Sequence, residues 1–178
     1  MLTINKLIPQ GRGLAPVIIK RASSVELDWD VRCKSRFDAT DSAGRAIAVF
    51  LPRGTVVRGG DVLVADDGSF IAVKAAAQPV LVVRHCSQHG APLDLARAAY
   101  HLGNRHVQLE LRADHLKIEP DHVLADMLRQ QHLLVSEALE AFEPEAGAYG
   151  SGGHAHHDHA DAHPDVHPHD HHGHAHGH

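Results

Sequence analysis

The stretch that decides the fold spans residues 79–142: PVLVVRHCSQHGAPLDLARAAYHLGNRHVQLELRADHLKIEPDHVLADMLRQQHLLVSEALEAF. Its first six residues, PVLVVR (79–84), form a β-branched apolar run typical of a buried strand. The segment APLDLARAAYHLGN (91–104) then repeats apolar residues at helical spacing, and Gly103 is the expected C-cap of that helix. The inward stripe is expected to comprise Leu93, Leu95, Ala98 and Ala99.

The rest of the stretch continues the alternation of strands and helices. HVQLEL (106–111) and HLKIE (115–119) are expected to pair as strands across a short turn. DHVLADMLRQQ (121–131) predicts a second helix, N-capped by Asp121, and HLLVSEALEAF (132–142) predicts a final strand. The inward residues of the second helix are expected to be Val123, Leu124, Met127 and Leu128. The resulting order, β-α-β-β-α-β, is that of a ferredoxin-like domain.

The first half of the chain predicts a small all-β domain, so the whole is expected to be an α+β protein. Short β-branched runs alternate with turns of Gly, Pro and Asp, a spacing that favours a small barrel or sandwich. The expected strands are residues 25–29, 46–51, 55–58, 61–65 and 70–74. With KAAAQP (74–79) as the boundary, the expected domains are 1–76 and 77–148, and FEPEAGAYGSGG (142–153) ends the folded part.

Composition excludes several classes of protein. Aromatic residues are only 4% of the chain, so its core should be aliphatic. Outside the tail the 17 basic side chains face 22 − 4 = 18 acidic ones, with no clustered basic face of the kind that binds nucleic acid. Two cysteines give no disulfide framework, and the N-terminus lacks the apolar run of a signal peptide. No segment approaches a membrane span, and a reducing cytoplasm is the expected location.

The C-terminal tail, residues 149–178, is rich in histidine and is expected to be disordered, since such a composition cannot bury a core. It contains four Asp and no Lys or Arg, so protonation can move its side-chain charge from −4 towards 12 − 4 = +8 as the pH falls through about 6.5. Its candidate metal ligands are His154, His156, His157, His159, His163, His167, His169, His171, His172, His174, His176 and His178.

Imidazole suits nickel, zinc and copper, and neighbouring ligands on one flexible chain raise each other's effective concentration. The tail therefore indicates binding of several ions in fast exchange, with a selectivity that composition does not decide. A purification tag would also be rich in histidine, but the scattered Asp, Ala, Gly and Pro residues argue against one. A tail that serves only solubility, without a ligand, would not need twelve histidines.

Other histidines lie in the second half of the chain. In YHLGNRHV (100–107), His101 occupies the last turn of the expected helix and His106 should emerge at the surface. They could be metal ligands, or a helix C-terminal histidine favoured by the macrodipole and a strand-start histidine bonded to backbone. On spacing alone these structural roles are preferred, because a lone pair of histidines is a weak motif.

Two further groups of candidate ligands have a structural alternative. His122 follows Asp121 at a helix N-terminus, which disfavours imidazolium and keeps the ring able to ligate, although it could be an ordinary first-turn residue. RHCSQH (84–89) contains Cys86 between His85 and His89, and a loop cysteine without a ligand role is the preferred interpretation. The chain has no HExxH, GxxxxGK[ST] or GxSxG, so no enzyme is indicated.

Several segments together resemble the urease accessory nickel metallochaperones, the UreE family. They are LPRGTVVRGGDVLVADDG (51–68), AYHLGNRHV (99–107), DHVLADMLRQ (121–130), EPEAGAY (143–149) and the His-rich tail. The resemblance implies an N-terminal domain that binds partner proteins and a C-terminal ferredoxin-like domain that binds metal and dimerises. It implies Ni²⁺ as the cargo, with Zn²⁺ or Cu²⁺ as competitors, and delivery to the urease maturation complex through an accessory GTPase.

The resemblance also implies roles for individual residues. His106 would meet its two-fold mate at the dimer interface and hold nickel there, and His122 would be a secondary ligand. His101 matches a family histidine without a clear ligand role. Pro120 stands where some relatives have a histidine, so a secondary site must combine His122 with Asp121 or a tail histidine. The remaining alternatives are a general nickel or zinc store acting through the tail and a metal-dependent hydrolase, for which no active-site motif is present.

Overall fold

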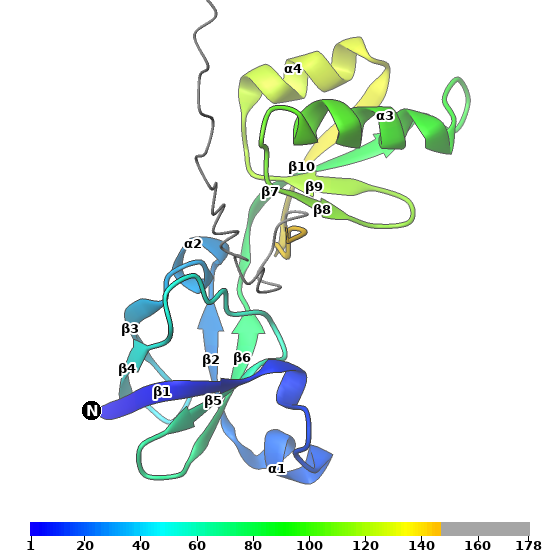
Figure 1. Cartoon of the computed structure of the whole chain (residues 1–178). Helices are drawn as coiled ribbons and strands as arrows, with labels where there is room; N and C mark the ends of the chain where they lie inside the picture. The colour runs from blue at the N-terminus through cyan, green and yellow to red at the C-terminus, as the bar shows by residue number, and fades with distance from the viewer. Residues whose placement is uncertain (147–178) are drawn as a thin grey trace, which may run out of the picture.

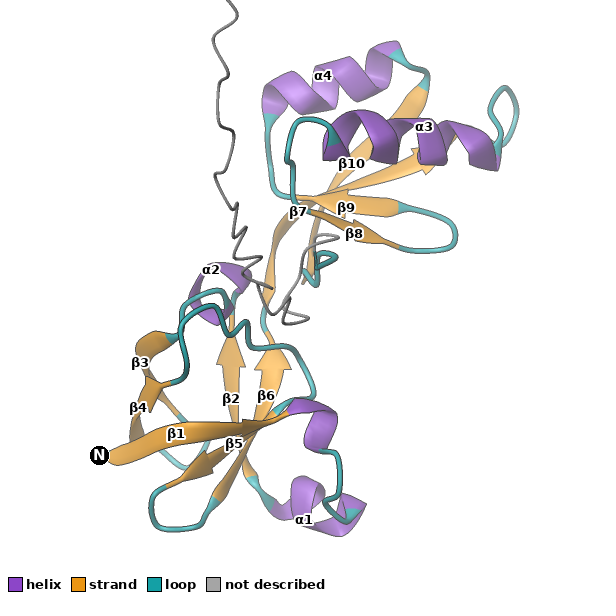
Figure 2. Ribbon diagram, viewed as in Figure 1, coloured by secondary structure: helices purple, strands orange, loops and turns teal. Residues whose placement is uncertain are grey.

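The computed structural model describes residues 1–146, which form two β-sheets with helices in a mixed α+β arrangement (Figures 1 and 2). The predicted fold class is confirmed. The tail expected at 149–178 lies outside the described residues. None of the helices in the described part is long and apolar enough to cross a membrane.

The first sheet has six strands in the order β2-β6-β5-β1-β4-β3. Its strands are β1 Leu2–Ile8, β2 Ser23–Leu27, β3 Arg36–Thr40, β4 Ala46–Phe50, β5 Val62–Ala65 and β6 Phe70–Ala75. Three short helices, η1 Pro9–Gly11, α1 Pro16–Arg21 and α2 Trp29–Arg32, lie in the connections. Just beyond β3, the N–H of Ser42 donates to the carbonyl oxygen of Ser24 in β2 (2.7 Å), which brings the two edge strands together at one end.

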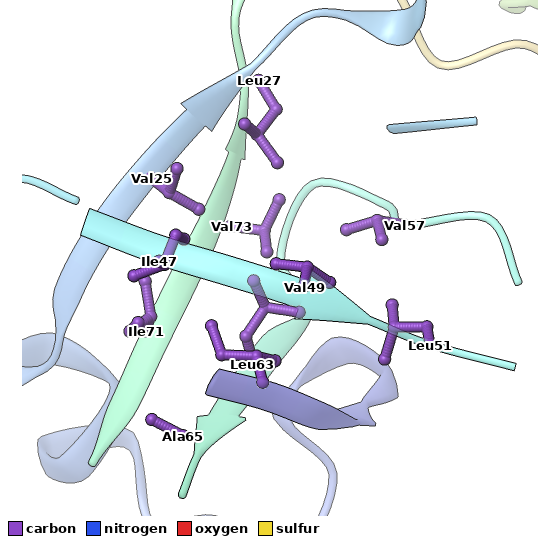
Figure 3. Packing of buried hydrophobic residues seen from close by; sticks show 11 residues of the cluster. Val25, Leu27, Ile47, Val49, Leu51, Val57, Leu63, Ala65, Ile71 and Val73 are labelled. Atoms are coloured by element: carbon purple, nitrogen blue, oxygen red, sulfur yellow. The ribbon is translucent and has the colours of Figure 1, made fainter. Parts of the chain in front are cut away.

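The buried side chains of this sheet form an aliphatic core, as the low aromatic content predicts (Figure 3). Alternate residues of the strands point inward, the period expected when one face of a sheet is buried. The core comprises Ile4, Val25, Leu27, Ile47, Val49, Leu51, Val57, Leu63, Ala65, Ile71 and Val73.

The sequence-based assignment of this half needs three corrections. The strand expected at 25–29 ends at Leu27, because Asp28 accepts a hydrogen bond from the N–H of Val31 (2.8 Å) and starts α2. Residues 55–58 form a loop whose backbone bonds go to α2 and to the side chain of Asp61. Strands β1 and β3 and the short helices η1, α1 and α2 were not predicted.

The second sheet has four antiparallel strands in the order β10-β7-β9-β8. Its elements are β7 Ala77–His85, α3 Pro92–Gly103, β8 Leu109–Leu111, β9 Leu116–Ile118, α4 His122–Gln130 and β10 Leu133–Ala141. The predicted β-α-β-β-α-β order is confirmed. Both long helices cover the same face of the sheet (Figure 1), where Leu95, Leu102 and Leu128 pack against β7 and β9.

Details of this half also differ from expectation. The strand expected from His106 begins at Leu109, and Gly103 is the last helical residue rather than the C-cap. Leu93 and Val123 are exposed. At about 100° per residue, Leu93 lies roughly 200° around α3 from Leu95, and Val123 lies about 100° around α4 from Leu124. Both therefore fall off the buried stripes.

The other face of the second sheet meets the first half of the chain. Trp29 from α2 packs with Val80 and Val82 of β7 and with Phe142, which is fully buried. The Trp29 and Phe142 rings are edge to face, with centroids 6.2 Å apart. The segment 142–145, expected to lead out of the folded part, is thus a structural element that joins the two halves.

Candidate metal site

His106 lies in the turn that ends α3. Its φ of 57° is in the left-handed region, and its N–H donates to the carbonyl oxygen of Gly103 (2.9 Å). The N–H of Val107 donates to the carbonyl oxygen of Leu102 (3.1 Å). Together these bonds make a Schellman motif with His106 at the left-handed C′ position, and Val107 and Leu102 belong to the same apolar cluster.

Glycine is the usual residue at such a position, because a Cβ is disfavoured at positive φ. Here the position carries an imidazole, and the residue is exposed. The turn therefore presents a side chain outward at a site where the backbone alone would prefer none. His132 occupies the equivalent position after α4, with φ 61° and its N–H bonded to the carbonyl oxygen of Arg129 (3.0 Å).

His122 is the first residue of α4, at the helix N-terminus predicted for it, and is exposed. Asp121 precedes it as the N-cap, and its Oδ1 accepts hydrogen bonds from the N–H groups of Val123 (2.8 Å) and Leu124 (2.9 Å). The capping role predicted for Asp121 is confirmed. If Asp121 and His122 held a metal ion together, the other carboxylate oxygen of Asp121 would be the one that the helix cap leaves free.

His101 lies in the last turn of α3, where its ring packs edge to face on Tyr100 with centroids 5.4 Å apart. Its backbone carbonyl accepts a hydrogen bond from the guanidinium of Arg105 (3.1 Å). The residue is exposed. These contacts hold His101 beside Tyr100 at the end of the helix.

Cys86 lies in the loop after β7, and its Sγ is 3.8 Å from Nδ1 of His89. Hydrogen bonds from the backbone N–H of Gln88 and from His89 lower the pKa of this thiol. His85 turns its Nδ1 towards the carbonyl oxygen of Cys86 (3.4 Å) instead. The pair Cys86–His89 is thus in contact, and His85 stands apart from it.

Within residues 1–146, no three His, Cys, Asp or Glu side chains are gathered as they would be around a metal ion. His101, His106 and His122 are exposed, and Asp121 is next to His122 in the chain. The tail histidines, His154 to His178, lie outside the described residues. Sequence patterns missed the left-handed turns at His106 and His132, since neither position carries the Gly or Asn that marks such a turn.

The chain matches known proteins over nearly its whole length. Residues 4–76 match the family described as UreE urease accessory protein, N-terminal domain, and residues 78–178 match the corresponding C-terminal domain. A urease accessory protein UreE from Albidiferax ferrireducens is 71% identical over 92% of this chain and 94% of its own.

Two further relatives carry the same name. The protein from Paracidovorax citrulli is 73% identical over 86% of this chain and 73% of its own length. The protein from Verminephrobacter eiseniae is 62% identical over 89% of this chain and 98% of its own length. Family matches to both halves and identities this high over most of each chain leave one assignment. The chain belongs to the UreE urease accessory protein family.

Proposed function

We propose that this protein is a nickel carrier that binds Ni²⁺ and delivers it for assembly of the urease nickel centre. It acts in the cytoplasm as a homodimer, with an accessory GTPase and the apo-urease maturation complex as partners. Membership of the UreE family supports a role in urease maturation. Nickel is the cargo, and Zn²⁺ and Cu²⁺ compete for the same imidazoles.

The observation that carries the proposal is the imidazole of His106 at a left-handed position that glycine would occupy more easily. His132 shares this geometry, and the resemblance of AYHLGNRHV (99–107) to the UreE family is what selects His106. Non-glycine residues at positive φ are uncommon and are found at functional sites more often than elsewhere. Histidine tolerates this conformation better than most residues, so the argument also needs its exposure. An exposed imidazole held on a hydrogen-bonded turn is a fixed ligand with room for a metal ion beside it.

One imidazole is too few ligands for a nickel ion, and a second copy of the chain can supply the next one. In a two-fold interface the same residue from each protomer meets its mate, so one His106 per chain becomes a pair. Apolar side chains on the outer surface of α3 support a second copy here: Leu93 and Tyr100 are 57% and 66% exposed, seven residues apart on one face leading towards His106.

The interface would leave coordination positions open, and these suit a carrier that must release its ion. His122, with the free oxygen of Asp121, can form a weaker secondary site. The twelve tail histidines can collect ions and pass them on, because ligands on one flexible chain exchange quickly. The tail also favours a second candidate function, a general nickel or zinc store in which the tail alone does the work.

Equilibrium dialysis with Ni²⁺ separates the two functions, using a chain truncated after Gly150. The test variant is His106→Gly, which removes the imidazole while giving the turn its preferred residue. The control is His132→Gly, which makes the same change at the matching turn after α4. We expect the truncated chain and the control to bind one tight ion per dimer, and the His106→Gly variant to bind none.

Sedimentation velocity accompanies the dialysis, since the dimer should persist without the metal. Loss of the dimer in His106→Gly would count against a metal site built on an existing interface. If the truncated chain binds no nickel at all, the tail is the metal site, and the storage function replaces the carrier function.

A further inference from the structure

Trp29, the only tryptophan of the chain, lies in α2 at the end of the first half that faces the second sheet (Figure 2). Its side chain is buried, and the guanidinium carbons of Arg32 and Arg58 lie 5.2 Å and 4.7 Å from the ring centroid. Its backbone N–H donates to the side-chain oxygen of Gln78 in β7 (2.7 Å). With Phe142 packed against it as well, the ring is held on several sides.

The indole N–H of Trp29 donates to the side-chain oxygen of Gln108 in the second half (2.5 Å). Gln108 belongs to no helix or strand, and it directly precedes Leu109, the first residue of β8. It follows His106 by two residues, so their Cα atoms are at most about 7 Å apart. The carbonyl oxygen of Leu109 accepts a hydrogen bond from the N–H of Glu145 (2.9 Å). Segment 106–109 is therefore tied to two groups that lie outside the second sheet.

The matching turn after α4 is held differently. His132 has the same left-handed conformation, but the next residue, Leu133, is already in β10 and pairs with β7. Its own sheet thus fixes that turn. After His106 the strand begins only at Leu109, and β8 is an edge strand that pairs with β9 alone. The position of His106 therefore depends on the contact with Trp29, whereas the position of His132 does not.

We propose that Trp29 is a positioning residue for the nickel site, and that the contact between the two halves determines how long His106 keeps its ion. While the indole N–H holds Gln108, segment 106–109 stays in place and presents the imidazole in a fixed position, which favours binding. When α2 moves away, the segment loses this anchor and nickel leaves faster. Because the two equilibria are linked, metal at His106 in turn favours the contact between Trp29 and Gln108. The inference rests on the proposed function, since it takes His106 as a nickel ligand.

Nickel dissociation from the full chain tests the positioning role. The protein receives about one Ni²⁺ per two chains, and an excess of a chromogenic chelator then captures the ion. Ions on the tail exchange quickly, so the slow phase reports the His106 site. We expect Gln108→Met to speed the slow phase about threefold or more, because a hydrogen bond to the segment is lost. Gln108→Glu keeps an acceptor for the indole N–H and should release nickel no faster than wild type.

Matched variants locate the effect. Gln130→Met makes the same change at an exposed glutamine of α4 and should leave the slow phase unchanged. Trp29→Phe removes the donor of the same bond, so adding Gln108→Met to it should have no further effect. Urea denaturation checks that each variant is folded under the conditions of the assay. If Gln108→Met releases nickel at the wild-type rate, the contact does not position His106 and the inference is wrong.

The linked effect of metal on the contact is tested by ¹⁵N NMR, because a single tryptophan gives a single indole N–H resonance. Zn²⁺ is the probe, since it binds imidazole and, as a d¹⁰ ion, leaves the resonance sharp. We expect Zn²⁺ to slow exchange of the indole proton with solvent about threefold or more in wild type, and to have no such effect in His106→Gly. An exchange rate that Zn²⁺ leaves unchanged in wild type would overturn the inference.

The inference and the proposed function fail in different ways in the dissociation experiment. If the slow phase persists in His106→Gly, His106 does not hold the ion, and the proposed function fails together with this inference. If His106→Gly loses the slow phase while Gln108→Met keeps the wild-type rate, the nickel site stands and only the role of Trp29 is refuted.

Discussion

Arg32 joins the two halves of the molecule, and its replacement by methionine should destabilise the whole described fold. Its guanidinium is fully buried, and it donates to three oxygens: the carbonyls of Leu27 (3.0 Å) and Phe142 (2.6 Å) and the carboxylate of Glu143 (2.6 Å). Burial lowers the pKa of Arg32, and the Glu143 carboxylate opposes that shift. The charge is thus held inside by its partners.

The loss of stability can be estimated from the polar groups that lose their hydrogen-bond donor in Arg32→Met. Two carbonyl oxygens lose a donor, and Glu143 keeps only the N–H of Gly59 (2.8 Å) and the guanidinium of Arg58 (3.3 Å). Breaking a buried ion pair by removing one partner costs about 3–5 kcal/mol. Because the Glu143 side chain is 24% exposed and can be hydrated, the lower end, about 3 kcal/mol, is expected.

Urea denaturation at pH 7.5 measures this loss in the free energy of unfolding. EDTA is present because bound metal would otherwise add to the stability. The control is Lys34→Met, which breaks the exposed pair with Asp30, whose side chains are 52% and 82% exposed. That change should cost about 0.5 kcal/mol or less. If the two variants lose the same free energy of unfolding, Arg32 does not join the halves as described.

Three further predictions concern acid stability, helix capping and the tail. Burial disfavours ionisation of Asp41, but hydrogen bonds from Arg45 overcome it and lower the pKa to about 2. The stability from this carboxylate is present above its unfolded pKa of about 4 and is lost as the pH falls towards 2. The melting temperature of Asp41→Asn should therefore lie below wild type at pH 7 and approach it at pH 2. Asp121→Ala removes the cap of α4 and should cost about 1 kcal/mol in urea denaturation; no loss would contradict the capping bonds. Nickel bound by the full chain in excess of the truncated chain should be released as the pH falls through about 6.5, measured by dialysis across pH; retention at pH 5 would exclude imidazole ligands.

The second sheet could be predicted from sequence because its elements carry strong periodic signals. PVLVVR and the stripes of α3 and α4 match the period of the structures they form, and Asp121 is a standard N-cap. The order of elements then fixes the ferredoxin-like topology. Strands β1 and β3 were missed because LTINKLI and RFDAT bury only part of one face, so their patterns are weak.

Contacts between residues far apart in the chain could not be predicted from sequence patterns. The contact between Arg32 and Glu143 joins residues 111 positions apart, and the run EPE at 143–145 reads as a simple exit from the fold. At the candidate site, spacing alone favoured structural roles for His106, and the family resemblance selected His106 and His122 as ligands. Neither gave any sign that His106 occupies a left-handed Schellman position, because that depends on where α3 ends.

The most direct measurement of the central claim is nickel-dependent urease activation. Apo-urease with its accessory proteins receives limiting Ni²⁺ together with wild type, His106→Gly or His132→Gly, and the rate of urea hydrolysis is followed. We expect wild type and His132→Gly to activate urease equally, and His106→Gly to give little activation above the reaction without this protein. Equal activation by all three would show that His106 has no part in nickel delivery.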